Sequence, residues 1–211
     1  MRAQEFLVEG RNHPVICVDV QPEYCGINDG DESTVCIDIV NFVALRQTGP
    51  VLMFVNAEDQ GQTGDTVTSV QQYWEDTLRQ LTNDYETEQL INWSRFQVVD
   101  KGYGYLRSWM DQGISPAAII RVIRAMYQHR ISDSREFEDI DPMMLPQLVG
   151  SEWDQWMYHD PIIVNWISVA QLKRFSGAYI VGGGRNECLR EVELLMNAFN
   201  IKYKRIDSLV Y

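Results

Sequence analysis

The sequence is poor in the residues that build metal centres and disulfide frameworks, because only four of its 211 residues are cysteine and three are histidine. Cys17, Cys25, Cys36 and Cys188 are too few and too scattered for a CxxC metal site or a disulfide framework. The first three stand in or beside apolar runs, where a buried cysteine is ordinarily a reduced thiol. We therefore expect thiols rather than disulfides.

Basic residues are also scarce. There are 18 lysines and arginines against 30 aspartates and glutamates, which gives a net charge of −12. Such a balance disfavours nucleic acids and anionic membranes as partners. No apolar run is long enough to cross a bilayer, and the first residues lack the apolar core of a signal peptide. We expect a cytoplasmic protein with neither nucleic acid nor membrane among its partners.

Strand-like and helix-like segments alternate along the chain, and residues 1–211 are expected to form a single domain. Helix signals begin at Ser33 or Thr34, near Val70 (continuing to about 92), at Ser115-Pro116 and at Cys188. Apolar runs predict strands at 14–20, 51–55, 96–99, 178–181 and 201–206, with 161–164 as a further candidate. This alternation predicts an α/β fold with a central, mainly parallel sheet flanked by helices.

The most informative stretch is 178–189, which predicts a buried strand, a glycine turn and Cys188 in the first turn of a helix. Gly183 and Gly184 let a ligand approach the backbone closely, and the backbone N–H groups of Gly184 and Cys188 are candidate oxyanion donors. The positive end of a helix favours the thiolate of a cysteine. The alternative is that Cys188 is a core residue on a helix stripe. A dinucleotide-binding turn is disfavoured, because Glu187 occupies the position of its third glycine.

Two other predicted strands end in reactive side chains. Asp19 closes the first strand and Lys101 follows the third. Ligands bind beyond the carboxyl ends of parallel strands, so Asp19 and Lys101 are expected to meet Cys188 there. A carboxylate takes the proton of a thiol, an ammonium lowers its pKa, and the thiolate attacks a carbonyl carbon. The alternative assigns Asp19 to capping a turn and leaves Lys101 solvated.

Segments 15–24, 98–103 and 181–188 together resemble the isochorismatase-like (nicotinamidase-like) cysteine hydrolase superfamily, and the similarity continues to Asp207, where the family has an acid. The resemblance implies a three-layer α/β fold. It also implies that Asp19 is the general base, Lys101 the orienting cation that lowers the thiol pKa, and Cys188 the covalent nucleophile. A cis peptide before the nucleophile turn would fall at Gly183-Gly184.

The chain also departs from that family. Nicotinamidases carry a histidine-containing metal cluster after the second strand, whereas residues 56–60 contain no histidine, so we expect no metal and no cofactor. The interval from Lys101 to Cys188 is longer than is usual for the family, which predicts a helical insertion within 105–160. If 161–164 takes the place of the lysine-bearing strand instead, the triad is incomplete.

The predicted function is metal-independent hydrolysis of an amide, carbamoyl or related carbonyl in a small molecule. Tyr24 and Tyr103, with Tyr105 and Trp109, are pocket candidates for a flat substrate, and core or surface placement is the alternative. Vinyl-ether cleavage, as in isochorismatase itself, ranks lower because Cys188 is present. A second hypothesis is an inactive fold used as a binding or interaction protein, with the insertion and the tryptophans at a partner interface. Family members often associate, so a homo-oligomer is possible.

Overall fold

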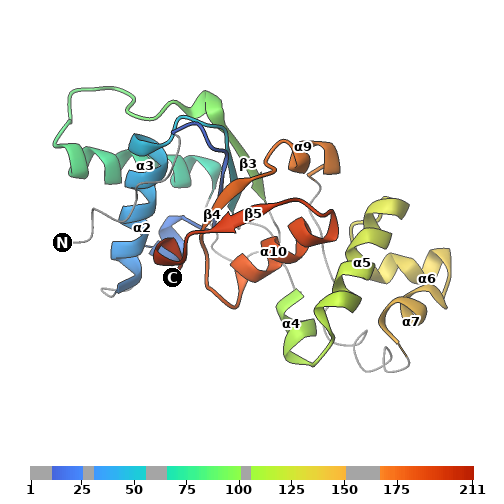
Figure 1. The fold of residues 1–211 in the computed structure, drawn as a ribbon. Helices are drawn as coiled ribbons and strands as arrows, with labels where there is room; N and C mark the ends of the chain where they lie inside the picture. Colours follow the sequence, from blue (N-terminus) through green and yellow to red (C-terminus); the bar gives the residue numbers. More distant parts are fainter. Residues whose placement is uncertain (1–10, 26–30, 56–65, 101–105, 151–166) are drawn as a thin grey trace.

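A computed structural model of the chain describes residues 11–25, 31–55, 66–100, 106–150 and 167–211 (Figure 1). In these ranges five strands form one sheet, in the order β3-β2-β1-β4-β5, and every neighbouring pair is parallel. The strands are β1 (Val15–Val18), β2 (Val51–Val55), β3 (Phe96–Asp100), β4 (Ala178–Gly182) and β5 (Tyr203–Arg205). The predicted α/β class with a parallel sheet is confirmed.

The order of the strands reverses next to β1. From β1 the chain builds outward through β2 and β3 on one side, and then returns to place β4 and β5 on the other. β1 and β4 are therefore neighbours although most of the chain separates them, and Val18 pairs with Gly182 at their carboxyl ends. All residues of both strands are buried, as expected for central parallel strands covered on both faces. Open α/β sheets bind ligands beyond such a reversal point.

Helices cover both faces of the sheet. One face packs Cys17, Met53 and Val181 against α2 and α3, and the other packs residues such as Ile16 and Ile180 against α9 and α10. Figure 1 shows α2 and α3 on the opposite side of the sheet from α10. The helical segments are α1 (Pro22–Cys25), α2 (Asp31–Asn41), η1 (Phe42–Arg46), α3 (Val67–Thr82), η2 (Trp93–Arg95), α4 (Leu106–Asp111), α5 (Pro116–His129), η3 (Ser134–Glu136), α6 (Phe137–Ile140), α7 (Met144–Val149), α9 (Val169–Lys173), α10 (Cys188–Ala198) and η4 (Asp207–Leu209).

The described residues between β3 and β4 are helical, and 106–149 have a core of their own. Trp109 and Phe137 lie in that core, which continues onto the outer side of α10 through Leu194 and Ala198. In Figure 1 this group, α4 to α7, lies beyond α10 and away from the sheet. The strand candidate at 161–164 lies outside the described residues.

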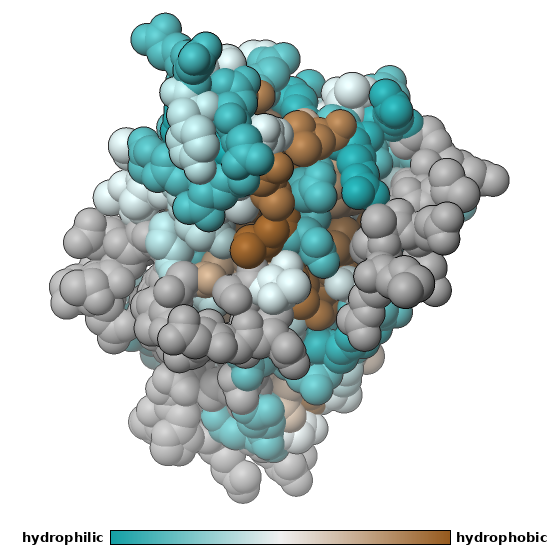
Figure 2. Space-filling model, turned by 90° about the vertical axis from the view of Figure 1, so that its left-hand side faces the viewer, coloured by the Kyte–Doolittle hydropathy of each residue, from teal (hydrophilic) through white to brown (hydrophobic). Residues whose placement is uncertain are grey.

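The outer surface on the side of α2 and α3 is mainly hydrophilic, with a broken band of apolar side chains (Figure 2). Ile37 of α2, Leu45 of η1 and Leu81 of α3 are among the exposed large apolar residues. Among the helices described, none combines the length and the apolar character required to traverse a lipid bilayer.

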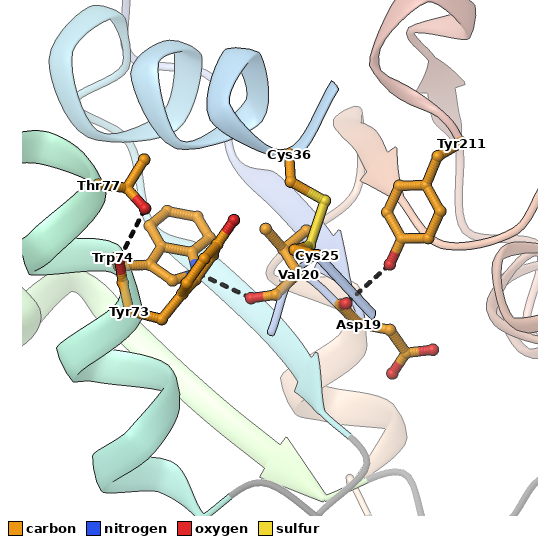
Figure 3. The surroundings of a disulfide bond; sticks show 8 residues. All are labelled: Asp19, Val20, Cys25, Cys36, Tyr73, Trp74, Thr77 and Tyr211. Atoms are coloured by element: carbon orange, nitrogen blue, oxygen red, sulfur yellow. Dashed lines mark hydrogen bonds between the residues drawn. A yellow bond between two sulfur atoms is a disulfide. The ribbon is translucent and has the colours of Figure 1, made fainter. Parts of the chain in front are cut away.

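The prediction that the cysteines are reduced is wrong for Cys25 and Cys36, which form a disulfide between α1 and α2 (Figure 3). The two residues are 11 positions apart in sequence, but their Cα atoms are only 5.8 Å apart, within the range that a disulfide spans. Sequence spacing does not reveal this approach, because it depends on how α2 packs against α1. Cys17 and Cys188 lie outside the disulfide.

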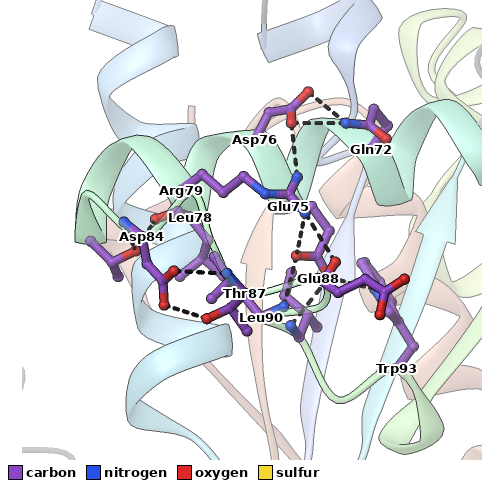
Figure 4. A network of polar contacts seen from close by, with 12 residues as sticks. Gln72, Glu75, Asp76, Leu78, Arg79, Asp84, Thr87, Glu88, Leu90 and Trp93 are labelled. Atoms are coloured by element: carbon purple, nitrogen blue, oxygen red, sulfur yellow. Dashed lines mark hydrogen bonds and ion pairs between the residues drawn. The ribbon is translucent and has the colours of Figure 1, made fainter.

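The one or two helices predicted from Val70 to about 92 are a single helix that ends early, at Thr82, where Asn83 caps it with a left-handed φ of 54°. A buried carboxylate on α3 holds the loop that follows (Figure 4). Glu75 accepts hydrogen bonds from the backbone N–H groups of Leu90 and Ile91, at 3.0 and 3.2 Å, and from the Trp93 indole at 3.0 Å. These contacts fix the approach of the chain to β3, whose carboxyl end precedes Lys101.

We expect Glu75→Gln to lower the free energy of unfolding by about 2–3 kcal/mol, because an amide cannot accept all three bonds and places an N–H group against a donor. The matched control is Asp76→Asn on the next position of α3. The Asp76 side chain is half exposed and pairs with Arg79 at 3.1 Å, so its change should stay within about 0.5 kcal/mol. Equal urea midpoints for the two variants would contradict this account.

The disulfide should stabilise the fold by about 2–3 kcal/mol, the chain-entropy value for the short loop that it closes. Cys25→Ser/Cys36→Ser should therefore unfold at lower urea, and wild type in dithiothreitol should match it. Thiol titration of the unfolded protein should find two thiols without reductant and four with it. Four thiols in both conditions, or a midpoint insensitive to dithiothreitol, would refute the bond.

Candidate functional site

Asp19 lies directly beyond β1 in an unusual and well-supported conformation. Its φ of 53° is left-handed, a region that aspartate and asparagine tolerate better than most residues with a Cβ atom. Its N–H donates to the carbonyl of Phe54 at 2.9 Å, and its own carbonyl accepts from Gln21 N–H at 2.9 Å and from the Tyr211 hydroxyl at 2.7 Å (Figure 3). The residue is 1% exposed. The backbone of Asp19 is thus held at the carboxyl edge of the sheet by β2, through Phe54, and by Tyr211.

The segment after Asp19 is fixed by α3 and by the disulfide. The Trp74 indole donates a buried hydrogen bond of 2.8 Å to the carbonyl of Val20 (Figure 3). Cys25 N–H donates to the carbonyl of Gln21 at 2.9 Å, and the disulfide then joins this short helix to α2. These contacts anchor the backbone that follows Asp19 to the layer formed by α2 and α3.

The glycine turn after β4 is required by backbone geometry. Gly182 and Gly183 have φ values of 82° and 65°, in the left-handed region that favours glycine. A Cβ atom at Gly182 would lie 2.4 Å from the carbonyl oxygen of Val18, and one at Gly183 would lie 3.1 Å from the backbone nitrogen of Leu189. The turn therefore brings the start of α10 tightly against the end of β1.

The cis peptide that the family resemblance implies is not found, since no peptide bond between described residues is cis. The bond from Gly183 to Gly184 is trans. Two successive left-handed glycines redirect the chain from β4 into the turn without it.

Cys188 is the first residue of α10 and is partly exposed, while its neighbour Leu189 is fully buried. The thiol thus lies at the positive end of an 11-residue helix, at the edge of the core between α10 and the sheet. Cys17 provides the contrast. It is fully buried in β1, and burial raises the pKa of its thiol far above the ordinary value.

Tyr211, which sequence reasoning missed, contacts the backbone at the ends of both β1 and β4. Burial raises the pKa of its phenol, the negative charges of Asp19 and Cys188 raise it further, and Tyr24 adds a smaller effect. A hydrogen bond with the Gly183 backbone acts in the opposite direction. The Tyr211 hydroxyl is therefore within electrostatic reach of Asp19, Cys188 and Tyr24, three residues that the sequence had singled out. The apolar run before it predicts burial, but no signal assigns it to a site.

Part of the predicted site lies outside the described residues. Lys101, Tyr103 and Tyr105 fall in the range 101–105. Among the described residues, Asp19 and the glycine turn that precedes Cys188 follow neighbouring strands, and the position of the lysine stays a prediction.

Three other predicted roles need correction. Asp207 lies in η4 rather than at the end of a strand, and it pairs with Arg185 at 3.0 Å and Arg205 at 2.7 Å. Trp109 is 1% exposed in the core of the helical group, so it lines no pocket. Trp74 is also fully buried, so neither tryptophan is available to a partner interface. The sequence could not show this, because tryptophan serves cores and interfaces equally well.

The predicted oxyanion donors differ in what surrounds them. The Gly183 N–H faces the Tyr211 hydroxyl. The carbonyl of Gly184 accepts from Glu187 N–H at 3.0 Å, and its N–H remains a candidate donor. In the described part of the chain, no three histidine, cysteine, aspartate or glutamate side chains gather in a way that would hold a metal ion.

Comparison with known proteins gives no relative: no family model, no curated protein and no solved structure matches the chain.

We expect Gly182→Ala to destabilise the protein by at least about 2 kcal/mol more than Gly177→Ala. Both glycines are left-handed, at 82° and 84°, so both variants carry the same conformational penalty of about 1–2 kcal/mol. Only Gly182 would place a methyl group against the Val18 carbonyl, since nothing lies within 4 Å of a Cβ atom at Gly177. Urea denaturation of both variants measures the difference, and equal losses would show that β1 and β4 do not approach this closely.

Proposed function

We propose that the protein is a metal-independent cysteine hydrolase with an isochorismatase-like fold, acting on an amide, carbamoyl or related carbonyl of a small molecule. The observation that supports this most strongly is that Asp19 and Cys188 follow the neighbouring parallel strands β1 and β4, with the Tyr211 hydroxyl bonded to the carbonyl of Asp19 and close to the charges of both residues. A carboxylate and a thiol thus share the carboxyl edge of a parallel sheet at its reversal point, where ligands bind in such folds.

The proposed reaction divides hydrolysis into two acyl transfers. Asp19 accepts the proton of Cys188, and the thiolate, favoured by the start of α10, attacks the carbonyl carbon. N–H groups of the turn, including that of Gly184, stabilise the oxyanion. The leaving amine takes the proton from Asp19 as the carbon–nitrogen bond breaks, which leaves a thioester on Cys188. Water, deprotonated by Asp19, then releases the acid and restores the thiol. Lys101 is the proposed cation that lowers the thiol pKa.

The non-catalytic alternative places tryptophans at a partner surface. Trp74 and Trp109 are core residues, whereas Trp153, Trp156 and Trp166 lie outside the described residues. The vinyl-ether reaction of isochorismatase would use the same Asp19 and is the second candidate. A small-molecule substrate, rather than a nucleic acid or a membrane, fits the net charge of −12. A homo-oligomer remains a prediction.

The compartment is a separate proposal, because the disulfide counts against the cytoplasmic expectation. Disulfides persist in oxidising compartments and are rare in a reducing cytoplasm. The Cys25–Cys36 bond therefore favours an oxidising environment for this protein.

Iodoacetamide labelling tests the proposed nucleophile, because each other cysteine is protected. Cys25 and Cys36 are bonded to each other and Cys17 is fully buried, so the folded protein should label once, at Cys188. We expect the labelling rate to follow a thiol pKa below about 8.5, the ordinary value. Lys101→Ala should raise that pKa, since it removes the proposed cation.

Cys188→Ser is the control and should abolish labelling. A labelling pKa at or above the ordinary value in wild type, unchanged in Lys101→Ala, would refute the proposed hydrolase.

A further inference from the structure

We infer that Tyr211 is a positioning residue of the proposed site, whose hydroxyl joins the ends of β1 and β4 and thereby fixes the Asp19 carboxylate relative to the Cys188 thiol. This inference rests on the proposed function. It adds a residue that belongs neither to the predicted triad nor to the glycine turn.

The segment bearing Tyr211 is anchored on both sides of the sheet. Leu209 is fully buried in the core on the α2 and α3 face. The next residue, Val210, is 8% exposed and lies in the core on the α10 face. Two consecutive side chains thus insert into opposite layers, which leaves Tyr211 little freedom to move.

Tyr211 contacts the turn after β4 through its backbone as well as its side chain. Its carbonyl accepts a hydrogen bond of 3.0 Å from the Arg185 N–H. Its hydroxyl meets the Gly183 backbone. The residue therefore spans the loop that leads from β4 to Cys188.

The same hydroxyl donates a hydrogen bond of 2.7 Å to the carbonyl of Asp19, drawn as a dashed line in Figure 3. Asp19 holds a left-handed backbone, and a hydrogen bond to its carbonyl restrains the peptide unit that follows it. One phenol thus contacts the residue after β1 and the residue after β4, at the point where the strand order reverses.

The chemical state of the phenol suits this role. Burial and the nearby charges of Asp19 and Cys188 raise its pKa, so it remains protonated where ordinary tyrosines begin to ionise. A hydroxyl that keeps its proton serves as a permanent donor to Asp19 and cannot replace Asp19 as the base.

The shift that the Asp19 carboxylate causes in the pKa of the Cys188 thiol depends on the distance between the two groups, so it measures whether Asp19 is held in position. A carboxylate close to a thiol disfavours the thiolate, so Asp19→Asn should lower the labelling pKa of Cys188 in wild type. If Tyr211 positions Asp19, the same substitution in a Tyr211→Phe background should give less than about half of that shift, because the carboxylate no longer keeps one position. The comparison uses four proteins: wild type, the two single variants and the double variant. All four retain the other titratable groups that are near the thiol in space, in sequence or by prediction, namely Tyr24, Arg185, Glu187 and Lys101.

Tyr203→Phe is the matched control. Its hydroxyl accepts a hydrogen bond from the Asn197 side chain at 3.3 Å, and neither Asp19 nor Cys188 is among the charges that affect its pKa. The shift caused by Asp19→Asn should be fully retained in this background. Urea midpoints of every variant establish that labelling is compared between folded proteins.

The outcomes separate the inference from the function on which it rests. If Asp19→Asn shifts the labelling pKa equally in wild type and in Tyr211→Phe, the site stands and the positioning role of Tyr211 is refuted. If Asp19→Asn causes no shift even in wild type, the carboxylate and the thiol do not share a site, and both proposals fail. A reduced shift in Tyr211→Phe alone supports the inference.

Discussion

The close approach of β1 and β4 at their carboxyl ends is the constraint on which the candidate site depends. Val18 and Gly182 are paired, and the carbonyl of Val18 lies so near Gly182 that a Cβ atom has no room there. At this end both strands give way to left-handed backbone, at Asp19 after β1 and at Gly182 and Gly183 at the end of β4. Two reactive side chains from distant parts of the sequence are therefore delivered to one edge.

The support for this edge comes from the layer of α2 and α3 and from the segment that bears Tyr211. The indole of Trp74, the Cys25–Cys36 disulfide and the hydroxyl of Tyr211 hold the backbone that leaves β1. A buried carboxylate on a left-handed backbone is costly to fold, and such costs concentrate at functional sites. The number of contacts that hold the backbone after β1 agrees with a functional site that requires a fixed geometry.

The cysteines show how one residue type takes different roles according to its surroundings. Cys17 is fully buried in the sheet, Cys25 and Cys36 form a disulfide, and Cys188 is partly exposed at the start of a helix. The sequence alone singled out Cys188, because only that cysteine follows a strand and a glycine turn. It gave the wrong state for Cys25 and Cys36, since a local apolar run carries no information about which helix packs beside it.

The sequence by itself determined the elements and their class. Continuous apolar runs such as 51–55 specify buried strands, and Ser115 followed by Pro116 specifies a helix start, because both are local consequences of burial and capping. It also identified Asp19, the glycine turn and Cys188 as strand-end features. Only the tertiary structure decided that Asp207 serves an ion-pair network and that Tyr211 joins the site. These outcomes depend on contacts between segments far apart in the chain, and no local pattern encodes the packing that brings such segments together.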